Sequence, residues 1–204
     1  MRKRKANAQT LNNFSRASHP GLVILSHEKL RRLEPQLFPQ GIYKFLRYIP
    51  TLRKRWDWWL LRIEEHLNNG DSRAAVVVYL EPLIVAAYTD ELDCVALLEF
   101  PDEFVEEYKL TAGSRLLTVN LYRRREKGLA PDLVPGERDH KRYGNFIPYI
   151  AEFLSDDNER IAARKTEISE EEWQRAEQMG REALRKCDGA TRDGSPLLAD
   201  EPAE

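Results

Sequence analysis

Residues 74–101, AAVVVYLEPLIVAAYTDELDCVALLEFP, carry the clearest structural pattern in the sequence. Three runs rich in β-branched and apolar residues follow one another within this stretch, at residues 74–80, 83–88 and 94–100. This composition is typical of β-strands, and the short connections between the runs are typical of antiparallel neighbours. The second and third runs are apolar at both alternating positions, which indicates strands covered on both faces. A fourth run, at residues 115–122, alternates apolar and polar side chains and predicts a further strand.

Helical patterns lie on both sides of these strands. The strongest places six apolar residues on one helix face, namely Leu52, Trp56, Trp59, Leu60, Ile63 and Leu67. Ser26 is placed to cap an earlier helix, and Ser169 with Glu172 forms a capping box for a later helix that should run to about Lys186. Further helical turns are expected at 42–49, 101–108, 146–154 and 157–165, and an edge strand at 21–26. We therefore predict an α+β fold, a small and mostly antiparallel sheet of three to five strands flanked by N-terminal and C-terminal helices.

The same patterns predict one folded domain between two tails. Residues 1–20 should form a disordered basic arm, residues 21–186 the α+β domain, and residues 187–204 a disordered tail. Within the domain we expect a helical part, a sheet part, a long loop and C-terminal helices, at residues 21–70, 71–125, 126–145 and 146–186. A loop of this length is typical of functional or disordered segments.

The charge of the chain is unevenly distributed. The formal net charge of the 204 residues is −2. Residues 1–68 hold 14 Lys or Arg and five Asp or Glu, a net charge of +9, whereas the rest hold 18 and 29, a net charge of −11. Such asymmetry is expected either for a basic arm that binds an anionic partner or for two halves that attract each other. Both interpretations stay open.

Cysteine usage and hydropathy point to the cytoplasm. Cys94 and Cys187 lie far apart in the sequence and predict neither a disulfide framework nor a metal-ligand pair. The basic start lacks the apolar region of a secretory signal, and no stretch approaches the roughly 18 apolar residues of a membrane span. We expect a soluble cytoplasmic protein without a membrane segment.

Two large apolar residues do not fit the helix stripe described above. At 100° per residue, Trp58 and Leu61 fall on the opposite side of that helix, beside Glu65, where a solvated helix is normally polar. Either another element of the chain covers this second face, or Trp58 and Leu61 contact a partner. They are the candidate interaction surface.

Basic residues gather at both ends of the predicted long loop. They are Arg123, Arg124, Arg125 and Lys127 at its start and Arg138, His140, Lys141 and Arg142 at its end, followed by Tyr143 as an aromatic stacking surface. If the two ends meet, the cluster suits a phosphate or a nucleic acid. The alternative is a solvated loop whose neighbouring carboxylates neutralise these charges.

The turn between the second and third runs is acidic. It carries Asp90, Glu91 and Asp93, and Glu81 and Glu99 flank it toward the strand ends. Five converging carboxylates would suit a hard cation. We expect instead a solvated hairpin tip, because carboxylates close in sequence repel one another and stay hydrated.

No catalytic signature occurs in the sequence, which has no glycine-rich phosphate loop, dinucleotide fingerprint or nucleophile elbow. The sequence therefore favours a non-catalytic intracellular binding or regulatory module whose partner is another protein or a second copy of the chain. It calls for no cofactor and no metal. Two alternatives stay open: a nucleic-acid- or phosphate-binding protein that uses the basic clusters at 123–127 and 138–142, and a metal-dependent hydrolase that uses the acidic hairpin 81–99.

Overall fold

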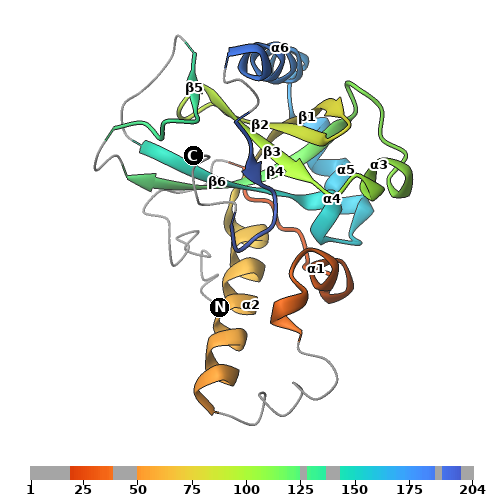
Figure 1. Cartoon of the computed structure of the whole chain (residues 1–204), viewed down its shortest axis with the longest axis vertical. Helices are drawn as coiled ribbons and strands as arrows, with labels where there is room; N and C mark the ends of the chain where they lie inside the picture. The colour runs from red at the N-terminus through yellow and green to blue at the C-terminus, as the bar shows by residue number, and fades with distance from the viewer. Residues whose placement is uncertain (1–18, 39–49, 125–127, 137–142, 187–189, 199–204) are drawn as a thin grey trace, which may run out of the picture.

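The computed structural model describes residues 19–38, 50–124, 128–136, 143–186 and 190–198, with only the backbone for residues 50–53 and 124. Its centre is a curled sheet with the strand order β5-β3-β2-β1-β4-β6, in which neighbours run antiparallel (Figure 1). The strands are β1 Asp71–Leu80, β2 Leu83–Thr89, β3 Cys94–Phe100, β4 Arg115–Arg124, β5 Val134–Pro135, β6 Tyr143–Ile150 and β7 Arg192–Asp193, which pairs with β3 in parallel. The helices are α1 His27–Leu33, the 3-10 turn η1 Pro35–Leu37, α2 Pro50–Asn69, α3 Glu103–Glu107, α4 Ala151–Leu154, α5 Asn158–Glu167 and α6 Glu170–Lys186.

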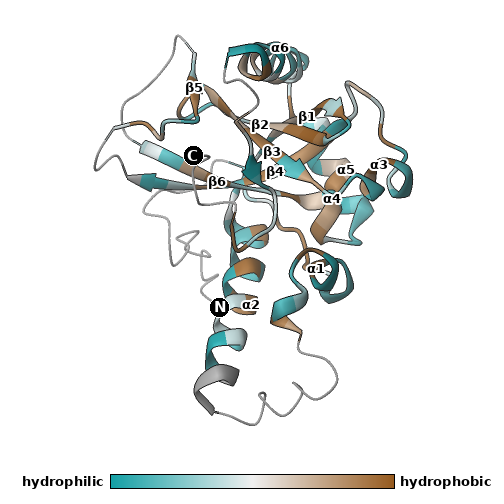
Figure 2. Ribbon diagram, in the orientation of Figure 1, coloured by the Kyte–Doolittle hydropathy of each residue, from teal (hydrophilic) through white to brown (hydrophobic). Residues whose placement is uncertain are grey.

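The α+β class and the four predicted strands are confirmed. Both faces of the central strands are buried, and Figure 2 shows the predominance of hydrophobic residues along β1, β2 and β3. Inside the curl, Val85 and Leu98 belong to one apolar cluster with Phe146 and Phe153. Because every large side chain removed from water contributes about 1.5–3 kcal/mol, this interior is the main source of folding free energy.

Helix α6 covers the outer face of β1, β2 and β3. Its start is the predicted one, since the Ser169 hydroxyl accepts a hydrogen bond from the Glu172 N–H at 3.2 Å and Ile168 packs in the same cluster as Trp173. The Glu172 carboxylate, however, accepts from the Ala74 N–H at 2.9 Å and so ties the helix to β1.

The other outer face, that of β4 and β6, is covered by helices from the first half of the chain. Ile63 and Leu67 of α2 lie in one cluster with Leu30 of α1 and with Val119 and Tyr149 of the strands. Residues before α1 also line α2, where the Val23 N–H donates to the Leu67 carbonyl at 3.2 Å. Only the C-terminal part of α2 meets the sheet, and Figure 1 shows the rest of the helix extending beyond it.

Three predictions about elements were wrong. The sheet has seven strands instead of three to five, because the two-residue strands β5 and β7 extend it at β3. Residues 146–150, predicted as helix, belong to β6, and the helix begins only at Ala151. Residues 21–26, predicted as an edge strand, lie outside the strands, and in this part of the described chain only Pro20 bridges to Asp71.

The tails and the loop also differ from expectation where the structure describes them, since the predicted loop 126–145 holds β5 and the start of β6. Residues 190–198 lie against the sheet, although the sequence places them in the disordered tail 187–204. Arg192 is buried there, paired with Asp132, and donates to the Phe146 carbonyl at 2.9 Å. His19 and Pro20, assigned to the basic arm, contact β1, whereas residues 1–18 and the predicted helix 42–49 lie outside the described residues.

Candidate functional site

Helix α2 has an inner face fixed to the sheet. Ile63 and Leu67 are fully buried, and Trp56, Trp59 and Leu60 pack partly buried against the same cluster. The predicted apolar stripe is therefore confirmed for its described side chains. The helix ends where the sequence indicates, since the Gly70 N–H closes on the His66 carbonyl at 2.7 Å after Asn69.

The opposite face of α2 exposes Trp58 and Leu61. Their exposed fractions are 45% and 61%. The Trp58 ring is held in place, because it meets the Trp59 ring edge-on at 4.9 Å between centroids and the Arg62 guanidinium lies 4.3 Å from its centroid. A large, ordered and exposed aromatic beside an exposed leucine is typical of protein interfaces, in which tryptophan supplies much of the binding energy.

A buried ionic cluster lies at the end of β1 nearest this helix. Arg73 makes ion pairs with Asp71 at 2.8 Å and with Asp90 at 2.7 Å, and its guanidinium lies 3.9 Å from Glu172. Asp71 also accepts from the Tyr122 hydroxyl at 3.0 Å. Burial raises the pKa values of Asp90 and Glu172, because the charged carboxylates lose water. The cluster thus joins the hairpin tip, β1 and α6 through one guanidinium.

Asp93 corrects the expectation of a solvated hairpin tip. Its side chain is buried, accepts a hydrogen bond from the Tyr88 hydroxyl at 3.0 Å and receives two from the Arg175 guanidinium, one of them at 2.6 Å. The prediction that all three carboxylates of this turn point into water was therefore wrong for Asp93, and Asp90 is engaged by Arg73. The compensating cations lie outside the turn, on β1 and on α6, and Arg175 of α6 is 82 residues away from Asp93 in the sequence.

The strand register also separates the acidic residues of the hairpin. Thr89 pairs with Cys94 beside the turn, whereas Ile84 pairs with Glu99 near the other end of the strands. At about 3.3 Å per residue, Glu81 and Glu99 lie on the order of 20 Å from the turn. No grouping of three His, Cys, Asp or Glu side chains among the described residues is arranged to hold a metal ion. The geometry does not bring the five carboxylates together as a hydrolase site of this hairpin requires.

The basic clusters are described only in part. Arg123 is exposed, the backbone of Arg124 pairs with Tyr143, and Arg125, Lys127, Arg138, His140, Lys141 and Arg142 lie outside the described residues. The register places Arg124 opposite Tyr143 near one end of β4 and β6. Tyr143, however, is only 2% exposed and its ring stacks on Tyr122 at 5.0 Å, so it offers no face to a base.

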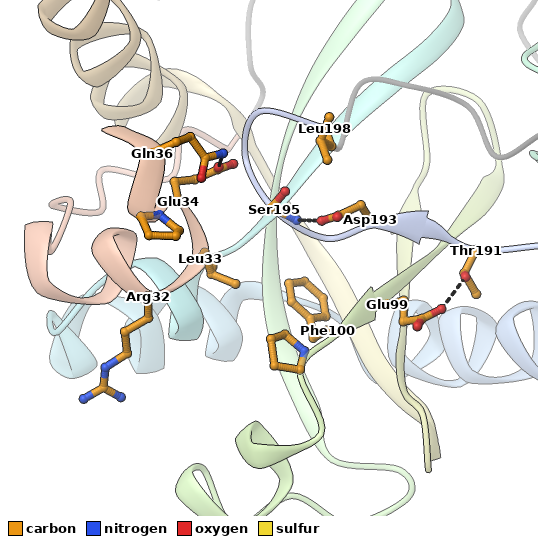
Figure 3. Close-up of a pocket in the computed structure, with 12 residues that line it drawn as sticks. Arg32, Leu33, Glu34, Gln36, Glu99, Phe100, Thr191, Asp193, Ser195 and Leu198 are labelled. Atoms are coloured by element: carbon orange, nitrogen blue, oxygen red, sulfur yellow. Dashed lines mark hydrogen bonds between the residues drawn. The ribbon is translucent and has the colours of Figure 1, made fainter. Parts of the chain in front are cut away.

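A cavity of about 680 Å³ lies between α1, the end of β3 and residues 190–198 (Figure 3). Its polar lining is largely engaged in the protein. The buried Glu34 accepts from the Leu197 N–H at 2.6 Å, Asp193 accepts from the Ser195 N–H at 2.7 Å, and Glu99 accepts from the Thr191 hydroxyl at 2.7 Å. Burial raises the pKa of Glu34. The contacts made by Glu34 and Glu99 fasten residues 190–198 to the body of the protein.

A second cavity, of about 450 Å³, lies beside the ionic cluster. Tyr88, Asp90, Glu172 and Arg175 contribute to its walls, and all four contact other side chains in the cluster or at the hairpin tip. No local pattern in the sequence predicts either cavity, because the first assembles residues from three separate segments and the second from two. Trp58 and Leu61 are the exposed candidates from the sequence whose side chains the structure fully describes. It also places them together.

Comparison of the chain with protein-family models, with curated proteins and with solved structures finds no match in any of the three. Among the described residues, no helix combines the length and the apolar composition needed to cross a bilayer.

Proposed function

We propose that the protein is a non-catalytic binding module that engages a protein partner through the outer face of α2. The observation that carries this proposal is the joint exposure of Trp58 and Leu61 on a helix whose opposite face is anchored in the core. A single exposed leucine is ordinary on a protein surface, but an exposed tryptophan next to it is costly unless a partner covers both. A rigid scaffold with a projecting helix is also a common way to present such anchors.

Substitutions on the two faces of α2 should differ in their effect on the free energy of unfolding. Trp58→Gln with Leu61→Gln keeps good helix formers at exposed positions and should lower the free energy of unfolding by less than about 1 kcal/mol. Leu67→Ala on the inner face should cost about 2–5 kcal/mol, because it opens a cavity in the core. Chemical denaturation of the three proteins measures both values.

The binding test uses the same double variant. A partner captured by the wild-type chain should be lost with Trp58→Gln and Leu61→Gln but retained with Tyr79→Ser, which removes another large exposed aromatic, 48% exposed on β1. A stability loss of several kcal/mol in the double variant, or an unchanged set of captured partners, contradicts the proposal.

A second candidate function is the binding of a nucleic acid or another phosphate-bearing anion. The pairing of Arg124 with Tyr143 supports it, because Arg124 belongs to the first basic cluster and Tyr143 directly follows the second in the sequence. Affinity for a mixed-sequence oligonucleotide should then fall steeply with salt, and Arg124→Ala with Lys141→Ala should reduce the slope. Arg185→Ala with Lys186→Ala, at the exposed end of α6, is the matched control. Absence of binding at low salt removes this candidate.

A further inference from the structure

The outer face of α2 carries a charged residue on either side of its two apolar residues. Lys54, Trp58, Leu61 and Glu65 follow one another at intervals of four, three and four residues. At 100° per residue these four positions lie within about 60° of one another, in the seam pattern by which helices pair. Lys54 is exposed and Glu65 is partly exposed, so the stripe is accessible along its length.

This stripe is complementary to itself when two copies run antiparallel. A two-fold axis through the point midway between Trp58 and Leu61 places Trp58 of one copy opposite Leu61 of the other. The same axis places Lys54 opposite Glu65 at both ends of the seam. That point is also the centre of α2, residues 50–69, so the helices overlap over their full length of about 30 Å.

A parallel arrangement of the same helices is unfavourable. It would place Lys54 beside Lys54 and Glu65 beside Glu65 of the second copy, and like charges at facing positions of a helix pair repel. The charges therefore select the antiparallel orientation, which also has the closed two-fold symmetry that is commonest among homo-oligomers.

Among the described residues, Trp58 and Leu61 are exposed on this face. The inner residues Ile63 and Leu67 keep their places in the core, and Figure 1 shows the N-terminal half of α2 extending beyond the sheet. The Trp58 ring is already ordered by Trp59 and Arg62, so binding costs little side-chain entropy.

We propose that two copies of the chain associate by antiparallel pairing of α2, with Trp58 of each copy packed on Leu61 of the other and Lys54 of each paired with Glu65 of the other. This inference names the partner of the surface proposed above and therefore rests on that proposal. One helix face is small compared with the roughly 1,200–2,000 Å² of stable interfaces. The association is consequently a concentration-dependent equilibrium between monomer and dimer.

Sedimentation equilibrium over a wide concentration range tests the pairing. The mass of the wild-type chain should rise from 23.8 kDa toward twice that value. Trp58→Gln with Leu61→Gln should weaken self-association by about tenfold or more, because two-fold symmetry removes each contact twice. Tyr79→Ser should leave it unchanged.

Charge exchange tests the orientation. Lys54→Glu alone and Glu65→Lys alone should each weaken the dimer, since each places like charges at both ends of the seam. Lys54→Glu combined with Glu65→Lys should restore it. Within one helix, Lys54→Glu places a like charge three residues from Asp57, and Glu65→Lys places one three residues from Arg62. If the substitutions acted only within their own helix, these two repulsions would add in the double variant. Recovery of the dimer therefore reports contact between copies.

The two proposals fail in different ways. A wild-type chain that stays monomeric at every concentration, or a charge exchange that does not restore the dimer, overturns the antiparallel pairing. In either case the proposed function still stands if the wild-type chain captures another protein that the variant with Trp58→Gln and Leu61→Gln does not capture. The unfolding midpoint of that variant must then stay unchanged. A large loss of stability in that variant overturns both.

Discussion

At the scale of single residues, Asp93 is held at the tip of the β2–β3 hairpin by contacts on two sides. Tyr88 donates to it from β2 and Arg175 from α6, and the backbone of Asp93 adopts a positive φ of 45°. Asparagine and aspartate accept this conformation more readily than most residues. The position therefore combines a backbone requirement with a buried charge, and the two can be separated by substitution.

Asp93→Asn should lower the free energy of unfolding by about 2–3 kcal/mol, because it removes the charge but keeps the shape and the backbone preference. This is less than the roughly 3–5 kcal/mol for fully buried pairs, since Arg175 is partly exposed. Asp90→Asn, on the same turn but half-exposed, should cost under about 1 kcal/mol. Urea unfolding distinguishes them, and equally small losses would show a hydrated tip.

His66 should give the protein a measurable dependence on pH. It is buried against Tyr149 and its Nε2 lies 2.7 Å from the Val119 carbonyl. Burial lowers the pKa of His66 to about 3. An unfolded chain takes up this proton near pH 6.5, so the stability contributed by neutral His66 is lost as pH falls from about 6.5 toward about 3.

The comparison with His66→Gln isolates this effect. Buried carboxylates such as Glu34 and Glu152, whose pKa values burial raises, act in the opposite direction but are present in both proteins. The stability advantage of the wild-type chain over the variant should shrink by about 2 kcal/mol between about pH 7.5 and about pH 5. A constant difference across this range would mean that His66 titrates normally in the folded state.

At the scale of elements, the close approach of α6 to the sheet depends on Gly180. A Cβ at this position would lie 2.4 Å from the Cβ of Ala86 on β2 and 3.0 Å from a methyl of Val78 on β1. Glycine normally weakens a helix interior by about 1 kcal/mol relative to alanine, so its presence here indicates a packing requirement.

Gly180→Ala should therefore destabilise the protein by about 1–3 kcal/mol, because overpacking outweighs the gain in helix propensity. Gln178→Ala, on the exposed side of α6, should change stability by less than about 0.5 kcal/mol. Combining Gly180→Ala with Ala86→Gly should recover part of the loss, and thermal unfolding measures all three. A stabilised Gly180→Ala variant would show that α6 can move away from β2 without cost.

At the scale of the whole molecule, local patterns predict elements better than they predict contacts. The four central strands, the capped start of α6 and the inner stripe of α2 follow from periods of two and 3.6 residues. β6 was missed because Phe146 and Ile150 face one cluster while Ile147 and Tyr149 face another, so no polar alternation marks it. Pro148 added to the ambiguity, although the last strand of the described sheet tolerates a missing N–H.

In the candidate site, too, local patterns predicted elements better than contacts. Trp58 and Leu61 were identifiable because a helix fixes which residues share a face. The partners of Asp93 and Asp132 were not, since Arg175 and Arg192 lie 82 and 60 residues away in the sequence. Whether an acidic turn is hydrated or buried depends on such distant cations, and the turn itself carries no sign of them.

We infer that two copies of the chain run antiparallel through the outer face of α2. Spin labels at Asp57 and, separately, at Asn68 test it most directly, because both positions are exposed on the flank of the seam. The antiparallel pairing predicts axial separations between copies of about 8 Å for position 57 and about 26 Å for position 68, at 1.5 Å per residue. Equal separations at the two positions would indicate a parallel pair, and the absence of coupling between labels at high concentration would contradict the pairing altogether.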